Sequence, residues 1–223
     1  MSTQSSTITS RPGAASIPAN TVIRNTYTLL SLTLIFSGLV AGVSMMLNLP
    51  HPGILLTLVG YFGLLFAITK FRNQGLGIAL VFALTGFMGY TLGPILNAYL
   101  SLANGGSIIM MAMGSTGAIF LGLSGYALVS RKDFSFMGGF LMVGILVAFL
   151  AGLGALFLQM PMLSLAVSSM FVLLMSGLIL YQTSAIIHGG ETNYVMATVT
   201  LFVSIFNLFT SLLHLLGFMG GEN

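Results

Sequence analysis

Seven long apolar stretches, separated by short polar turns, constrain this chain more than any other feature of its sequence. Crossing a bilayer takes about 20 apolar residues of helix, and these stretches are of that order. The turns between them contain the Asn, Gly and Pro residues that end helices. Backbone groups cannot stay unpaired in lipid, so we predict an all-α polytopic membrane protein with seven transmembrane helices. The predicted spans cover residues 26–47, 53–69, 76–99, 107–129, 136–158, 163–187 and 195–217.

The scarcity of charge excludes several classes of protein. Only 4% of the 223 residues are charged, which is too few for the surface of an ordinary soluble domain. The six Lys and Arg residues form no clustered basic face, so we expect no binding of nucleic acid. Cysteine is absent, which excludes thiol catalysis, disulfide bonds and Cys-ligated metals.

The positions of the basic residues predict the orientation in the membrane. They precede the first span or lie between the second and third and between the fourth and fifth spans, all on one side: Arg11, Arg24, Lys70, Arg72, Arg131 and Lys132. Basic loops stay in the cytoplasm, so we predict a cytoplasmic N-terminus and a C-terminus outside. Residues 1–22 are rich in Ser, Thr, Ala and Pro and are predicted to be a flexible cytoplasmic tail before a transmembrane domain of residues 23–223.

Polar residues follow one side of the last span. Thr200, Ser204, Asn207, Ser211 and His214 recur at steps of 4, 3, 4 and 3, which places them on one stripe of a helix. Exposing polar groups to hydrocarbon is costly, so the stripe should face protein or water, and the last helix should be central in the bundle. Two interpretations stay open, namely polar contacts between helices and a solvated pathway.

The hairpin formed by the last two spans adds Gln182 to this polar group. Gln182 lies about as far from the turn as Thr200 does, so the antiparallel helices can bring it level with Thr200 or Ser204. Hydrogen bonds between membrane helices contribute about 1 kcal/mol each. We therefore regard Gln182 and the stripe as the candidate polar core or pathway.

Glycine and proline predict how the helices pack. Three pairs have the small-xxx-small spacing that lets helix backbones approach closely: Gly38/Gly42, Gly89/Gly93 and Ala148/Gly152. Gly93 and Pro94 together are expected to kink or open the third span, because proline has no N–H and frees a carbonyl that then needs another partner.

Residues that carry chemistry are sparse and scattered. His51, His188 and His214 lie far apart in the predicted topology, and no acid lies within a span. Two ligands such as His188 and Glu191 do not make a metal site, and no nucleophile is paired with a base. We therefore expect no enzyme activity, no catalytic residue, no metal and no cofactor.

Three stretches together resemble the Bax inhibitor family of seven-helix membrane proteins. They run from Thr85 to Pro94, from Arg131 to Gly139 and from Leu180 to Leu216. The segments Arg24–Tyr27 and Ile186–Tyr194 are most similar to members from the bacterial inner membrane. The resemblance implies that six helices pack around the last one. It also implies an inner-membrane regulator, in contact with membrane lipids, that binds and modulates the membrane AAA protease FtsH in the quality control of membrane proteins.

The chain departs from the family at two positions. Many members have an aspartate in the sixth span and another in the seventh, a pair proposed to sense pH and gate a calcium leak. The matching residues here are Gln182 and Ser204, which do not titrate near neutral pH and supply no fixed charge. An ion leak channel or transporter that uses the stripe is thus the alternative function, and the sequence leaves the oligomeric state open.

Overall fold

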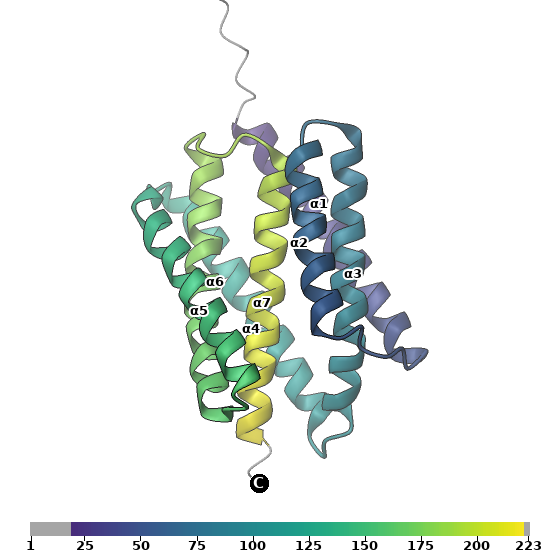
Figure 1. Ribbon diagram of the computed structural model, residues 1–223. Helices are drawn as coiled ribbons and strands as arrows, with labels where there is room; N and C mark the ends of the chain where they lie inside the picture. The colour runs from purple at the N-terminus through teal and green to yellow at the C-terminus, as the bar shows by residue number, and fades with distance from the viewer. Residues whose placement is uncertain (1–18, 221–223) are drawn as a thin grey trace, which may run out of the picture.

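The computed structural model describes residues 19–220, and this part of the chain is a bundle of long helices (Figure 1). Seven of its helices are long and apolar enough to cross a membrane, which confirms the all-α architecture. A short 3-10 helix, η1 (Ser135–Met137), precedes the fifth of them. The seven are α1 (Ala19–Met46), α2 (Ile54–Phe71), α3 (Gly75–Leu100), α4 (Gly105–Ser130), α5 (Gly138–Phe157), α6 (Pro161–Ile187) and α7 (Tyr194–Gly220).

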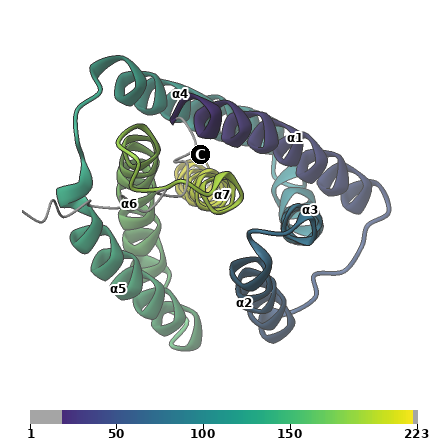
Figure 2. The ribbon, with the colours of Figure 1, turned by 90° about the horizontal axis from the view of Figure 1, so that it is seen from above.

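The last helix lies inside the bundle, as the polar stripe predicts. Seen from above, α7 lies in the middle of the bundle, with α1, α3, α4 and α6 around it and no described helix between α2 and α5 (Figure 2). Its side chains Leu201, Ser204 and Leu208 are fully buried. Helices α1, α4 and α6 contact α7 extensively, and α3 contacts it less. The other two stand farther out, because α2 packs mainly on α3 and α5 packs mainly on α6. The family resemblance implies six helices packed around the last one. In the structure four of them contact α7, and the other two, α2 and α5, lie outside these four.

The predicted N-terminal tail, residues 1–22, overlaps the start of the first helix. Helix α1 starts at Ala19, so residues 19–22 of the predicted tail are helical. Residues 1–18, which make up the rest of that predicted tail, lie outside the described residues, as do residues 221–223.

Helices α1 and α3 meet through backbone atoms, and we call this contact the α1–α3 seam. A Cβ atom added to Gly89 would collide with the backbone carbonyl of Ser37 in α1. One added to Gly93 would collide with the Ser44 side chain and lie 3.0 Å from the carbonyl oxygen of Ala41. The two glycines thus allow two helix backbones to touch.

The proline in α3 lies beside the same seam. Pro94 is inside the helix and has no N–H for the carbonyl oxygen of Tyr90, four residues earlier. The Ser44 hydroxyl of α1 donates a hydrogen bond of 3.0 Å to that carbonyl. Because Gly93 has no side chain, Ser44 can approach the helix at this point.

The other two small-residue pairs differ from the seam. A Cβ atom added to Gly38 or Gly42 would meet no atom within 4 Å, so this pair on α1 makes no close helix contact. In α5, Ala148 is fully buried, and a Cβ atom on Gly152 would make an ordinary contact of 3.5 Å with Val167. Equal spacing in sequence therefore corresponds to three different surroundings.

One end of the bundle carries the described basic residues. The start of α1 and the α2–α3, α4–α5 and α6–α7 loops lie together at the top of Figure 1 and form what we call the basic end. It carries Arg24, Lys70, Arg72, Arg131 and Lys132.

Candidate functional site

The predicted polar stripe is divided between buried and half-buried side chains. Ser204 and Ser211 are buried, whereas Thr200, Asn207 and His214 keep part of their surface exposed. Helix α7 is tightly covered along the sector that holds Ser204, and less so along the sector that holds Asn207. The stripe therefore lies at the edge of the buried core.

Two of the five stripe residues, Ser204 and Asn207, form side-chain hydrogen bonds within their own helix. The Ser204 hydroxyl donates to the carbonyl oxygen of Thr200 over 2.7 Å, and the Asn207 amide donates to that of Val203 over 2.8 Å. Such bonds to the preceding turn satisfy a polar group without a neighbouring helix. His214 is instead paired with another helix, since its Nδ1 lies 2.8 Å from the Ser168 hydroxyl of α6.

Gln182 lies in the core of the bundle, where its amide nitrogen has no protein partner. Its side chain is only 5% exposed, and its Nε2 atom makes no hydrogen bond. The adjacent Thr183 is paired with the Tyr27 hydroxyl of α1 over 3.2 Å. Two further buried oxygens, Thr26 Oγ1 and Ser124 Oγ, also have no partner. Unpaired polar atoms of this kind are typical sites for a bridging water.

Two cavities open at opposite ends of the helices. One of about 300 Å³ lies beside His214 and is lined by Tyr99 and Leu102, among others. The other, of about 560 Å³, lies at the basic end between the α2–α3 turn and the α6–α7 loop. Neither of these cavities is lined by Gln182 or Ser204.

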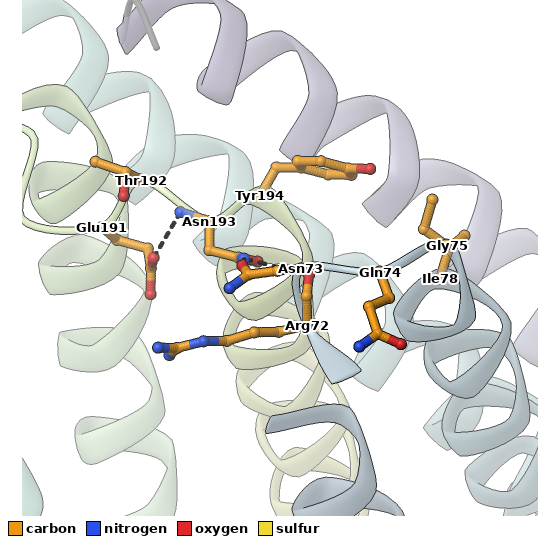
Figure 3. A pocket seen from close by; sticks show the side chains of 9 residues that line it. All are labelled: Arg72, Asn73, Gln74, Gly75, Ile78, Glu191, Thr192, Asn193 and Tyr194. Atoms are coloured by element: carbon orange, nitrogen blue, oxygen red, sulfur yellow. Dashed lines mark hydrogen bonds between the residues drawn. The ribbon is translucent and has the colours of Figure 1, made fainter. Parts of the chain in front are cut away.

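The larger cavity is built around Asn193 (Figure 3). Its amide donates to the carbonyl oxygen of Arg72 and to Asn73 Oδ1, over 3.2 and 2.8 Å. Its own Oδ1 accepts the backbone N–H groups of Val195 and Met196 and thereby caps the first turn of α7. One side chain thus joins the α2–α3 turn to the start of the central helix.

Charge of both signs lies around this cavity. The Arg72 and Glu191 side chains extend to the same side of it (Figure 3), and Glu191 Oε1 accepts the backbone N–H of Asn193 over 2.8 Å. Sequence reasoning missed this site. The signal was an Asn directly before an apolar helix, which is a preferred capping residue.

A second hydrogen-bonded cluster joins the α4–α5 loop to the end of α6. His188 Nδ1 lies 2.9 Å from the carbonyl oxygen of Ser184, and its Nε2 lies 3.1 Å from that of Arg131. The Ser184 hydroxyl donates to the carbonyl oxygen of Lys132 over 3.1 Å and accepts the N–H of Phe134 over 3.0 Å. We call these residues the loop clasp.

Asp133 lies in the same loop. Its carboxylate accepts the backbone N–H of Ser135 over 2.8 Å. The pKa of this exposed carboxyl is lowered, first by that bond, then by the Ser135 side chain, and further by the nearby charge of His188. Within residues 19–220, His, Asp and Glu form no group of three that could hold a metal ion.

Comparisons with known proteins decide the family. The family model described as "Inhibitor of apoptosis-promoting Bax1" matches residues 19–221, nearly the whole chain. The chain belongs to this Bax inhibitor family. Its bacterial relatives include the protein named "Modulator of FtsH protease YccA" in Escherichia coli K12, which is 56% identical over 197 residues. That alignment covers 88% of this chain and 90% of the relative.

Other Bax inhibitor relatives match over similar lengths. An uncharacterized protein of Pseudomonas aeruginosa is 57% identical over 202 residues, which are 91% of each chain. A membrane protein of Vibrio cholerae is 42% identical over 208 residues, 93% of each chain. In Escherichia coli O6:H1 the relative is named "Inner membrane protein YccA". The assignment of the chain to this family is therefore based on alignments that cover nearly the whole length of both proteins.

Proposed function

We propose that this protein is a non-enzymatic regulator of the membrane protease FtsH in the inner membrane. The observation that carries the proposal is the 56% identity to the E. coli protein named as a modulator of that protease, over about nine tenths of both chains. The family model also matches residues 19–221, a range that includes all seven long helices and the loops of the basic end. We further propose that the basic end is cytoplasmic, because its loops carry the basic residues.

The polar core supports a regulator more than a conduit. The Ser204 hydroxyl and the Asn207 amide nitrogen donate to carbonyl groups of their own helix, so both donors already have a partner. The cavities beside His214 and Asn193 lie at the two ends of the bundle and do not reach Gln182. A compact bundle with a backbone-to-backbone seam also suits a protein that resists extraction by a protease.

Copurification tests the proposal directly. A tagged copy of the chain is isolated from native membranes that contain FtsH, and FtsH is detected in the eluate. We expect FtsH to copurify and the degradation of a membrane-protein substrate of FtsH to slow when the chain is present. Replacing residues 1–18 with a folded segment should relieve that inhibition. Absence of FtsH from the eluate together with unchanged degradation would contradict the proposal.

One observation favours a second function, an ion leak through the bundle. Gln182 Nε2, Thr26 Oγ1 and Ser124 Oγ are buried polar atoms without protein partners, and such atoms can bind water. If the leak exists, the purified protein passes calcium or protons in liposomes, and Gln182→Leu reduces the flux. Flux no greater than that of empty liposomes would remove this alternative.

A further inference from the structure

The loop clasp contains more hydrogen-bond acceptors than a neutral histidine can satisfy. Both ring nitrogens of His188 face backbone carbonyl oxygens, which only accept hydrogen bonds. A protonated imidazole carries an N–H on both nitrogens, whereas a neutral one carries an N–H on only one. Protonated His188 therefore donates to Ser184 and Arg131 together, while the Ser184 hydroxyl stays free to donate to Lys132.

Loss of the proton removes one bond from this cluster. If neutral His188 keeps its N–H on Nε2, the Nδ1 lone pair faces the carbonyl oxygen of Ser184 at 2.9 Å. The Ser184 hydroxyl lies 3.3 Å from Nδ1 and can turn to donate to it, but it then gives up its bond to Lys132. If the N–H is on Nδ1 instead, the bond from Nε2 to Arg131 is lost. Each arrangement of the neutral ring has one bond fewer.

We propose that His188 is a pH-dependent switch at the basic end, which holds the α4–α5 loop against the end of α6 when it is protonated and loosens the loop when it is neutral. Histidine is the side chain that normally changes charge between about pH 5 and 8. All hydrogen bonds of the loop clasp form together only when His188 is protonated. The clasp therefore stabilises the loop at low pH, and this stabilisation decreases as the pH rises.

The charges around His188 act in both directions. Arg131 and Lys132 in the α4–α5 loop oppose a positive ring, and Asp133 in the same loop favours it. The position of His188 at the C-terminal cap of α6 also favours positive charge, because the carbonyl ends of the helix point toward it. The other titratable or charged groups on the elements that meet at this end are Arg24 and Tyr27 (α1), Lys70 (α2), Arg72 (α2–α3 turn), Tyr126 (α4), Tyr181 (α6), Glu191 (α6–α7 loop) and Tyr194 (α7).

The clasp connects the switch to the position of α5. Phe134, whose N–H donates to Ser184, directly precedes η1, and η1 leads into α5. Phe134 also packs against the Tyr126 ring of α4 at a centroid distance of 6.2 Å. Loosening the clasp would therefore free the exposed Arg131–Lys132 pair and the start of the outer helix, while the α1–α3 seam stays in place.

Hydrogen exchange of the Phe134 amide measures the switch in the intact protein. The full chain is placed in lipid nanodiscs, and the protection of this amide is compared at pH 5.5 and pH 8.0 after correction for intrinsic exchange. Losing one hydrogen bond of ordinary strength corresponds to a decrease in protection of about fivefold at the higher pH. In His188→Gln the protection should no longer depend on pH in this range.

A matched histidine at the opposite end provides the control. His51 lies in the α1–α2 loop, where its Nδ1 accepts the N–H of Gly53. His51→Gln should leave the pH dependence at Phe134 intact, whereas Asp133→Asn should lower the pH at which protection is lost. Unchanged protection between the two pH values in the unmodified protein would overturn the proposal. So would a His188→Gln variant that folds and keeps the pH dependence.

If His188→Gln does not fold, a titration of the unmodified protein decides. The ring signals of the three histidines are followed by NMR, together with the exchange of the Phe134 amide. The proposal requires that the midpoint for Phe134 coincides with that of the His188 ring. A match to the His51 or His214 ring instead would contradict it.

Discussion

The α1–α3 seam and the contact between α5 and α6 both have a glycine at a point of close approach. The atoms that pack against the glycine differ between the two contacts. At Gly89 an added Cβ atom would meet the backbone carbonyl of Ser37. At Gly144 in α5 it would meet the terminal Cδ2 methyl of Leu174, at 2.6 Å. Backbone cannot move without its helix, whereas the end of a leucine can rotate. Equally close contacts can therefore be rigid at one place and adaptable at another.

The largest effect is expected where backbone meets backbone. Gly89→Ala should destabilise the bundle by about 1–3 kcal/mol, because α1 and α3 must move apart to admit the methyl group. Reversible unfolding in mixed micelles measures the change. The matched control is Gly42→Ala on α1, which meets no atom within 4 Å and should change stability by less than about 1 kcal/mol. Equal losses in both variants would show that the seam is not rigid.

A smaller effect is expected at the adaptable contact. Gly144→Ala should cost less than about 1 kcal/mol, because Leu174 can change its rotamer and because alanine is favoured over glycine within a helix. The same unfolding measurement compares it with Gly89→Ala. If Gly144→Ala is the more damaging of the two, the distinction between backbone and side-chain neighbours fails.

The smallest effect is expected in the exposed loop before α5. The hydrogen bonds from Ser135 lower the pKa of Asp133 below the ordinary value of an aspartate. A lowered folded-state pKa contributes stability above the unfolded value, and this contribution is lost as the pH falls through the folded pKa. Asp133→Asn should therefore slightly reduce the dependence of the thermal midpoint on pH as the pH falls below the ordinary aspartate pKa of about 3.9. A control variant, Ser135→Ala, keeps the backbone bond and most of the dependence.

The fold class followed from the sequence because it depends on composition and length. Seven apolar stretches predicted seven membrane-spanning helices, and residues 19–220 contain seven helices long and apolar enough to cross a membrane. The central position of α7 was predicted from the polar stripe, although three of its five residues, Thr200, Asn207 and His214, remain partly exposed at the edge of the core. Helix length, hydropathy and the position of polar side chains on one face can each be read from the sequence of a single helix.

The parts that sequence could not predict depend on the partner of each residue. Gly38/Gly42 and Gly89/Gly93 have the same spacing, but only the second pair faces another backbone. The spacing of the stripe did not show that the Ser204 hydroxyl donates within its own helix. In the same way, Asn193 and His188 gain their roles from loops far away in sequence, which bring carbonyl groups to them.

The hydrogen bond between Ser44 and Tyr90 has a consequence for how the sequence can change over time. Pro94 removes a donor, Ser44 replaces that donor from another helix, and Gly93 leaves the room for it. A larger residue at position 93 excludes the hydroxyl, and a residue without a hydroxyl at position 44 leaves the partly buried Tyr90 carbonyl unpaired, a loss of about 1 kcal/mol. A proline at position 94 is therefore tolerated only while the other two are kept. Loss of the proline would free Ser44 to vary, whereas the Ala41 carbonyl would still require a glycine at position 93.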